Sequence, residues 1–337
     1  MKRTLLKLMR RSGVFVPFRY VNRNKVLILT YHRFSDAEDG RSTTGRAFAD
    51  HLAYLKAHYS ILPLSRIAKM LSNGSRMPAS AAAITIDDGF RDSYEIAYPI
   101  LRDFEVPATV FVVTHFVDKK AWLWTDKLRY LTGKTKTETA TLKFSGRYLT
   151  IKLNAFASRL EVAARINSIL KTLPDDVKDE AIEEIAITLG LELPKGPPAE
   201  YAPVSWEQLC EMDSHGLEIG SHSVTHPILT NTSDGQLGRE LRDSRARLEE
   251  VLGRAVKLFC YPNGSFDQRV RSAVANAGYE CAVTTELGLN SKNSDLLALH
   301  RVAAELDLDH FVQSTSGFEE VKMRLFPSRT GELIDGK

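Results

Sequence analysis

The strongest constraint on the fold is an alternation of apolar, strand-length segments with segments of helical periodicity. The first half of the chain predicts strands at 26–31, 82–86 and 108–113, and helices at 46–58, 65–72 and 93–104. Most residues of each strand are apolar, which is typical of strands buried on both faces. Strands that alternate with helices predict an α/β protein whose parallel sheet is covered by helices, either closed into a barrel or open.

The alternation stops near Asp118 and resumes near Ser205. Between these points the sequence predicts a hairpin over 141–153, two helices within 160–190, and a proline-rich linker over 194–203. We therefore interpret 118–204 as a mostly helical insertion in a domain spanning 25–337, which could cap a site or bind a partner. After it, we expect strands at 217–220, 257–261, 280–284 and 296–302, and helices at 233–252 and 267–277.

Charge is unevenly distributed along the chain. Residues 1–35 hold nine Lys and Arg residues and no acid, whereas the rest has 36 basic and 42 acidic residues. Leu5, Leu8 and Met9 could form one apolar helical face, so residues 1–24 predict either a basic arm that contacts a membrane surface or a solvated terminus that packs locally. The acidic body lacks a basic and aromatic stripe, which argues against a nucleic-acid partner.

Several features bear on the cellular compartment. Lys7, Arg10 and Arg11 interrupt the hydrophobic stretch that a signal peptide needs, and the longest apolar runs are too short to span a bilayer. The three cysteines are an odd number without CxxC spacing, so they predict neither a disulfide framework nor a cysteine metal site. We expect a cytoplasmic protein with possible peripheral contact at the inner membrane face.

Polar residues cluster at the ends of three predicted strands, where α/β proteins build their sites. The first cluster, Thr85-Ile86-Asp87-Asp88-Gly89, places two adjacent carboxylates after a buried strand. Two neighbouring carboxylates repel each other, and each raises the pKa of the other. A cation bound by one Asp would offset this repulsion and leave the other Asp ionised, as a base. Taken alone, the same residues are typical of a helix cap and turn.

The second cluster, Ser221-His222-Ser223-Val224-Thr225-His226-Pro227, places two histidines four residues apart, a spacing that can bind one metal ion or belong to an ordinary loop. It is not the HExxH motif of metalloproteases, because Ser223 stands at the position of the glutamate. The third cluster, Phe259-Cys260-Tyr261-Pro262-Asn263-Gly264, ends a strand in a turn that is either bare or presents backbone N–H groups to a ligand.

Together, the clusters predict a metal-dependent hydrolase. Asp88, His222 and His226 would form a site of two histidines and one carboxylate, with positions left open for water. Zinc favours these ligands, and three protein ligands plus water is the pattern of hydrolytic zinc sites. Bound zinc can bring the pKa of water to about 7, and Asp87 would lie beside that water as a base.

At this point the chain resembles the polysaccharide deacetylases, the NodB-like carbohydrate esterase family 4. The family pattern is T-[FY]-D-D-G, then H-[ST]-x-x-H, then a Y-P or P-Y turn, and TIDDG, HSVTH and FCYPNG follow in that order here. Tyr31-His32 resembles the bacterial exopolysaccharide-type branch. The resemblance covers about residues 25–115 and 205–320 and implies a distorted (β/α) barrel of about seven strands.

The resemblance also implies an activity and a set of site residues. The expected reaction is metal-dependent removal of N-acetyl groups from amino sugars of a polysaccharide or lipid-linked glycan. Asp87 would be the general base, and Asp88, His222 and His226 would bind a divalent metal, usually zinc. The backbone N–H of Tyr261 would help to hold the oxyanion.

The sequence departs from the family pattern at two points. Two histidines could be the general acid: His32 after the first strand, which we favour, and His300 on the last strand, where the L-x-H match is imperfect. Phe259 stands where common members carry an arginine that orients the catalytic Asp. Arg301, with Arg91 as the alternative, could replace that arginine by pairing with Asp87.

Two other functions use the same residues differently. Deformylation or O-deacetylation is one alternative, because a metal ion and a base can hydrolyse any of these small acyl groups in the same way. The other is a catalytically silent carbohydrate-binding protein. A sequence that lacked the base, a metal ligand or every acid candidate would have supported this alternative. This chain keeps the expected metal ligands and the base.

Overall fold

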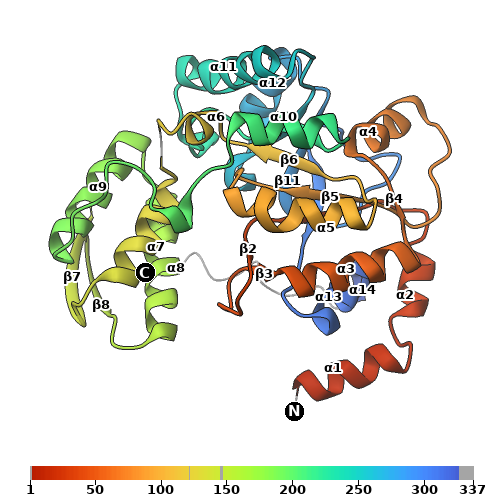
Figure 1. The fold of residues 1–337 in the computed structure, drawn as a ribbon, viewed down its shortest axis with the longest axis horizontal. Helices are drawn as coiled ribbons and strands as arrows, with labels where there is room; N and C mark the ends of the chain where they lie inside the picture. Colours follow the sequence, from red (N-terminus) through yellow and green to blue (C-terminus); the bar gives the residue numbers. More distant parts are fainter. Residues whose placement is uncertain (1, 121, 145–146, 326–337) are drawn as a thin grey trace.

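The core of the molecule is a ring of seven parallel strands surrounded by helices (Figure 1). The computed structural model describes residues 2–120, 122–144 and 147–325. Around the ring the strands follow the order β1 (Leu27–Tyr31), β12 (Leu299–Ala303), β11 (Cys281–Leu287), β10 (Leu258–Cys260), β9 (Glu218–Ser221), β6 (Thr109–Val112) and β5 (Ala81–Ile86). Pairing of β5 with β1 closes the ring, so the predicted distorted (β/α) barrel is confirmed.

Helices pack around the outside of this barrel (Figure 1). They are α3 (Gly45–His58), α4 (Leu64–Asn73), α5 (Tyr98–Asp103), α6 (Thr114–Val117), α10 (Trp206–Ser214), α11 (Asp234–Leu252), α12 (Gln268–Asn276), α13 (Leu308–Thr315) and α14 (Phe318–Leu325). The single helix predicted over 93–104 instead begins as a π-helical segment, Ser93–Ala97, and continues as α5. Short strands β2 (Phe34–Ser35), β3 (Thr43–Thr44) and β4 (Ser60–Ile61) and the 3-10 turns Leu229–Asn231 and Pro262–Gly264 complete this part.

Alternation along each strand separates two apolar layers. One set of side chains fills the barrel, including Ile28, Ala83 and Phe111. The neighbouring residues, such as Leu29 and Ile84, point outward and pack against the helices. Because successive strand residues face opposite sides, the same alternation decides which polar side chains at the strand ends turn into the barrel mouth.

The segment that interrupts the α/β alternation has a hydrophobic cluster of its own. It consists of α7 (Trp124–Lys134), β7 (Thr139–Phe144), β8 (Arg147–Lys152), α8 (Phe156–Leu170), α9 (Asp175–Thr188) and the 3-10 turn Ala199–Tyr201. β7 and β8 form the predicted antiparallel hairpin, whose turn at 145–146 lies outside the described residues. Leu128, Leu142, Ile166 and Ile182 are buried together, which explains why this segment stands beside the barrel in Figure 1 as a separate layer.

The N-terminal segment forms two helices, α1 (Lys2–Arg11) and α2 (Val16–Val21). They lie at the edge of the molecule next to α13 and α14 (Figure 1). Within the described residues, we find no helix with both the length and the apolar character needed to cross a bilayer.

Candidate active site

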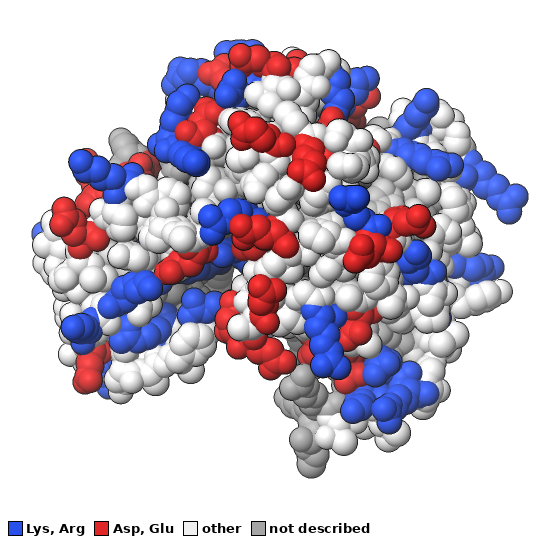
Figure 2. All heavy atoms as spheres, viewed as in Figure 1, with Lys and Arg blue, Asp and Glu red and all other residues white. Residues whose placement is uncertain are grey.

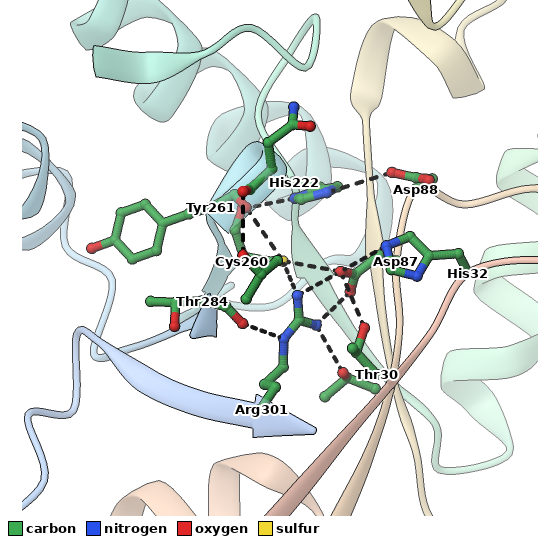
Figure 3. Close-up of polar contacts among 12 residues, drawn as sticks. Thr30, His32, Asp87, Asp88, His222, Cys260, Tyr261, Thr284 and Arg301 are labelled. Carbon is green, nitrogen blue, oxygen red and sulfur yellow. Dashed lines mark hydrogen bonds and ion pairs between the residues drawn. The ribbon is translucent and has the colours of Figure 1, made fainter. Parts of the chain in front are cut away.

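The three polar clusters meet at the carboxyl ends of the barrel strands (Figure 3). Asp87 and Asp88 directly follow β5, His222 follows β9, and Cys260 ends β10. Parallel strands bring these ends to one edge of the barrel, although the residues lie far apart in the sequence. The structure therefore brings together the base and the three metal ligands that the sequence predicts.

Asp87 is fixed by a buried ion pair with Arg301 (Figure 3). Arg301 donates through Nη1 to Asp87 Oδ1 at 2.8 Å and through Nη2 to Oδ2 at 2.7 Å. Burial by itself would raise the pKa of Asp87, but the guanidinium outweighs it and lowers the pKa to about 2. The predicted pairing with Arg301 is thus confirmed, whereas Arg91 pairs with Glu95 at 3.2 Å.

Asp88, His222 and His226 present ligand atoms to one point. Asp88 Oδ1 lies 3.5 Å from His222 Nε2 and 3.6 Å from His226 Nε2. His222 Nδ1 lies 2.7 Å from the carbonyl oxygen of Cys260, which can only accept, so Nδ1 carries a proton and Nε2 is left as the ligand atom. Asp88, Ser223 and His226 all have positive φ, a conformation that is uncommon for non-glycine residues and that clusters at active sites.

These three residues fit a divalent metal ion. Their ligand atoms lie within 4.8 Å of one another, and two imidazoles with one carboxylate are donors that zinc favours. Burial, followed by the neighbouring His222, lowers the pKa of His226 to about 3, which favours the neutral imidazole that binds a metal. Burial by itself would lower the pKa of His222, but contacts with Cys260 and Asp88 outweigh burial and raise that pKa, so a metal ion bound there would displace a proton from His222.

A second possible ligand group, Asp87, His222 and Cys260, is less suited to a metal. Both carboxylate oxygens of Asp87 already accept from Arg301, and Arg301 also donates to Cys260 Sγ at 3.2 Å. Burial raises the pKa of the Cys260 thiol, which keeps it protonated. No sequence pattern indicated the contacts of this cysteine, apart from its position at a strand end.

The HSVTH loop is held by a carboxylate that sequence reasoning missed. Glu240 of α11 accepts from the backbone N–H groups of Val224 and Thr225 at 2.8 and 2.9 Å and from the Thr225 hydroxyl at 2.7 Å. Such support orients the two histidines of the loop. In the sequence, Glu240 is one charge among many on a long polar helix.

The two candidate acids lie in different places. His32 Nε2 is 3.8 Å from Asp87 Oδ2, and its side chain is half exposed at the cleft. His300 precedes the inward-facing Arg301 on β12, so it points away from the barrel interior, and its Nε2 lies 3.2 Å from Glu286. The structure therefore brings His32 to the site and does not bring His300 there.

The expectation for Tyr261 requires a correction. Its backbone N–H donates to the carbonyl oxygen of Val283 at 3.1 Å, because strand pairing between β10 and β11 continues to this residue. Its hydroxyl donates to Leu297 O at 2.8 Å. The Tyr261 N–H is therefore committed to the sheet and is not a free donor for an oxyanion.

The site opens into a cleft of about 730 Å³. One side carries His32, Asp87 and the metal-ligand candidates, and the other is formed by α7 and α8. The residues from these two helices are Thr125, Leu128, Arg129, Leu160, Ala163, Ala164 and Asn167, and Lys171 directly follows α8. Burial lowers the pKa of Lys171, for which we find no ion pair within the described part of the chain. The segment that interrupts the barrel thus forms a wall of the cleft, which no local motif in the sequence indicated.

Comparison with known proteins agrees with this geometry. Residues 74–282 match the family model described as polysaccharide deacetylase. The Bacillus subtilis protein YxkH, provisionally named a polysaccharide deacetylase, is 23% identical over 279 residues, which cover 82% of this chain and 71% of YxkH. A poly-beta-1,6-N-acetyl-D-glucosamine N-deacetylase of Staphylococcus epidermidis is 27% identical over 111 residues, 28% of this chain and 38% of that protein. The structure of the Streptococcus pyogenes deacetylase PplD in complex with acetate shares the fold, with a TM-score of 0.59 and 19% identity over 87% of this chain and 98% of PplD.

Proposed function

Because this chain belongs to the polysaccharide deacetylase family, whose members are hydrolases, we propose that it is a metal-dependent N-deacetylase of amino sugars in a polysaccharide or a lipid-linked glycan. The observation that carries the proposal is the convergence of Asp88, His222 and His226 beside Asp87. The S. epidermidis relative is named for an N-acetylglucosamine polymer, which supports an N-acetylated hexosamine as the sugar.

The residues have distinct roles in this proposal. Asp88, His222 and His226 hold the divalent ion, for which zinc is the best match to the donor set. When bound, such an ion supplies Lewis-acid polarisation of the acetyl carbonyl and makes water more acidic. Asp87 is ionised and oriented by Arg301, so it is in the state needed to accept a proton from the attacking water. His32 then donates a proton to the leaving nitrogen as the C–N bond breaks.

The experiment is a joint measurement of metal content and acetate release. Elemental analysis of wild type is expected to find about one divalent ion per chain, consistent with a site of three protein ligands. His222→Ala should lose both the metal and the release of acetate from β-1,6-linked N-acetylglucosamine oligomers. The matched control is His215→Ala, an exposed histidine at the end of α10, which should keep both.

The outcomes separate the alternatives. If wild type takes up no metal even after reconstitution with divalent ions, the mechanism is wrong, and a carbohydrate-binding protein becomes the better hypothesis. Metal uptake together with release of formate, or of acetate from O-acetylated sugars only, would establish a different acyl hydrolase on the same residues.

The role of His32 has its own test. His32→Ala should remove most turnover while metal content stays at the wild-type level, because His32 contacts Asp87 and is not among the metal-ligand candidates. His300→Ala is the control and should keep its rate, since His300 lies outside the cleft. A near-wild-type rate for His32→Ala would reject His32 as the acid.

A further inference from the structure

The two N-terminal helices carry an unusual share of the exposed apolar surface. Eleven large apolar side chains are exposed among the described residues, and six of them lie within residues 5–21. These six are Leu5, Leu8, Val14, Val16, Tyr20 and Val21, with exposed fractions from 38% to 70%. Single exposed apolar residues are ordinary on soluble proteins, whereas a concentration of them in one short segment is typical of a surface that contacts something else.

This apolar surface cannot be hidden by a simple rotation of α1. Leu6 is buried with Phe15 and Val312, and Met9 packs against the same cluster. Arg10 forms an ion pair with Asp309 at the start of α13. These contacts anchor the inner face of α1, so Leu5 and Leu8 are held outward, toward solvent.

Basic side chains share the outer face of α1. Lys7 and Arg11 are exposed one helical turn apart, and we find neither of them in an ion pair within the described ranges. Just after α2, Arg23 stacks over the exposed ring of Tyr20, 3.9 Å from the ring centroid. Figure 2 shows basic side chains gathered beside uncharged surface at the lower edge of the molecule, where Figure 1 places α1. Residues 1–35 contain no acid at all.

The mixture of these side chains identifies the partner. Protein interfaces concentrate apolar residues in a core that is depleted of lysine. Here Lys7 lies between Leu5 and Leu8 on α1, and α2 carries Arg19 among apolar residues. This arrangement is typical of helices that lie in the plane of a bilayer, with apolar side chains in the acyl boundary and basic ones among anionic headgroups.

We propose that the outer face of α1 and α2, formed by Leu5, Lys7, Leu8, Arg11, Val16, Tyr20 and Val21, docks onto the surface of an anionic phospholipid bilayer. The contact is peripheral and is independent of the chemistry in the cleft. It would hold the enzyme where membrane-bound glycans are accessible.

The test is co-sedimentation of the full-length protein with phosphatidylcholine vesicles, with and without phosphatidylglycerol. Wild type should bind the anionic vesicles much more strongly. Lys7→Ala/Arg11→Ala removes two charges near the headgroups and should weaken the binding about 30-fold. Leu5→Ser/Leu8→Ser should weaken the binding at least tenfold, because two leucine side chains that would be partly buried in the bilayer are lost (about tenfold per 1.4 kcal/mol).

The matched control is Ile187→Ser, which removes an apolar side chain of α9 that is 77% exposed. This variant should bind vesicles like wild type, and every variant should show the wild-type circular dichroism spectrum and acetate release from soluble oligomers. Equal binding to both kinds of vesicle, wild-type binding by the Leu5/Leu8 variant, or an equal loss in Ile187→Ser would overturn the proposal. Self-association that disappears in the Leu5/Leu8 variant, without vesicle binding, would also overturn it and identify a protein interface. Because vesicle binding and acetate release are measured separately, failure of this inference differs from failure of the proposed function.

Discussion

The buried ion pair between Arg301 and Asp87 makes a sharp prediction about stability. The two side chains are 1% and 2% exposed. Besides both oxygens of Asp87, Arg301 donates to the Thr85 hydroxyl at 2.9 Å and to the Thr284 carbonyl at 2.7 Å. Arg301→Met keeps much of the length of the side chain but removes its charge and its donors, and so leaves the Asp87 carboxylate buried without its cation.

The expected loss is large for a single substitution. Removing one partner of a buried ion pair lowers the free energy of unfolding by about 3–5 kcal/mol. Replacing both partners is less costly, so Arg301→Met/Asp87→Asn should recover part of that loss. The remaining deficit comes from the oxygen atoms of Thr85 and Thr284, which lose their donor at a cost of about 1–3 kcal/mol for each buried group left unpaired.

The assay is urea unfolding at neutral pH followed by circular dichroism, with a chelator present so that metal binding does not contribute. Arg91→Met is the control, because Arg91 forms an exposed pair with Glu95 on one helix face and should change the free energy of unfolding by less than about 0.5 kcal/mol. Two results would refute the reasoning: an Arg301→Met variant within about 1 kcal/mol of wild type, or a double variant no more stable than the single one.

Three further predictions concern other parts of the molecule. Burial holds the pKa of His51 at about 4, below its usual 6.5. The unfolded state therefore binds more protons than the folded state, and the free energy of unfolding should fall by about 3 kcal/mol as the pH drops from 6.5 to 4. His51→Phe should flatten this part of a plot of the free energy of unfolding against pH. Glu240→Ala should lower metal affinity about 10- to 100-fold in a chelator competition, because the HSVTH loop loses three hydrogen bonds to this carboxylate. Unchanged affinity would show that the loop keeps its conformation without Glu240. Lys171→Glu should raise KM for a glycan with little change in kcat, because Lys171 lines the cleft apart from the metal ligands. Lys152→Glu, at an exposed position, is the control. A fall in kcat as large as the rise in KM would contradict a role of Lys171 in substrate binding alone.

Much of the architecture could be predicted because it depends on local patterns. Mostly apolar runs such as 82–86 predict buried strands, and helical periodicity between them requires crossover helices, so a parallel sheet covered by helices follows from short-range information. That the sheet closes into a barrel was implied by the resemblance to the deacetylase family. The TIDDG and HSVTH motifs are also local. Their positions at strand ends were enough to predict that Asp87, Asp88, His222 and His226 would meet.

The pairing of residues far apart depended on the closed barrel. Arg301 and Asp87 are 214 residues apart, and the sequence left Arg301 and Arg91 as alternatives. Closure of the ring places β12 next to β1, and β1 next to β5, so Arg301 faces the mouth at Asp87. The same register turns His300 outward and leaves His32 as the acid candidate at the cleft.

Sequence alone therefore determined the kind of fold, the metal-ligand candidates and the family, because each rests on residue type and short spacing. Tertiary structure alone decided which arginine neutralises Asp87, that the Tyr261 N–H is used by strand pairing, and that α7 and α8 wall the cleft. It also decided which face of α1 stays exposed. These outcomes depend on which side chains and backbone donors meet once the strands form a closed barrel and the outer segments pack against it. The spacing of residues along the chain does not predict such long-range contacts.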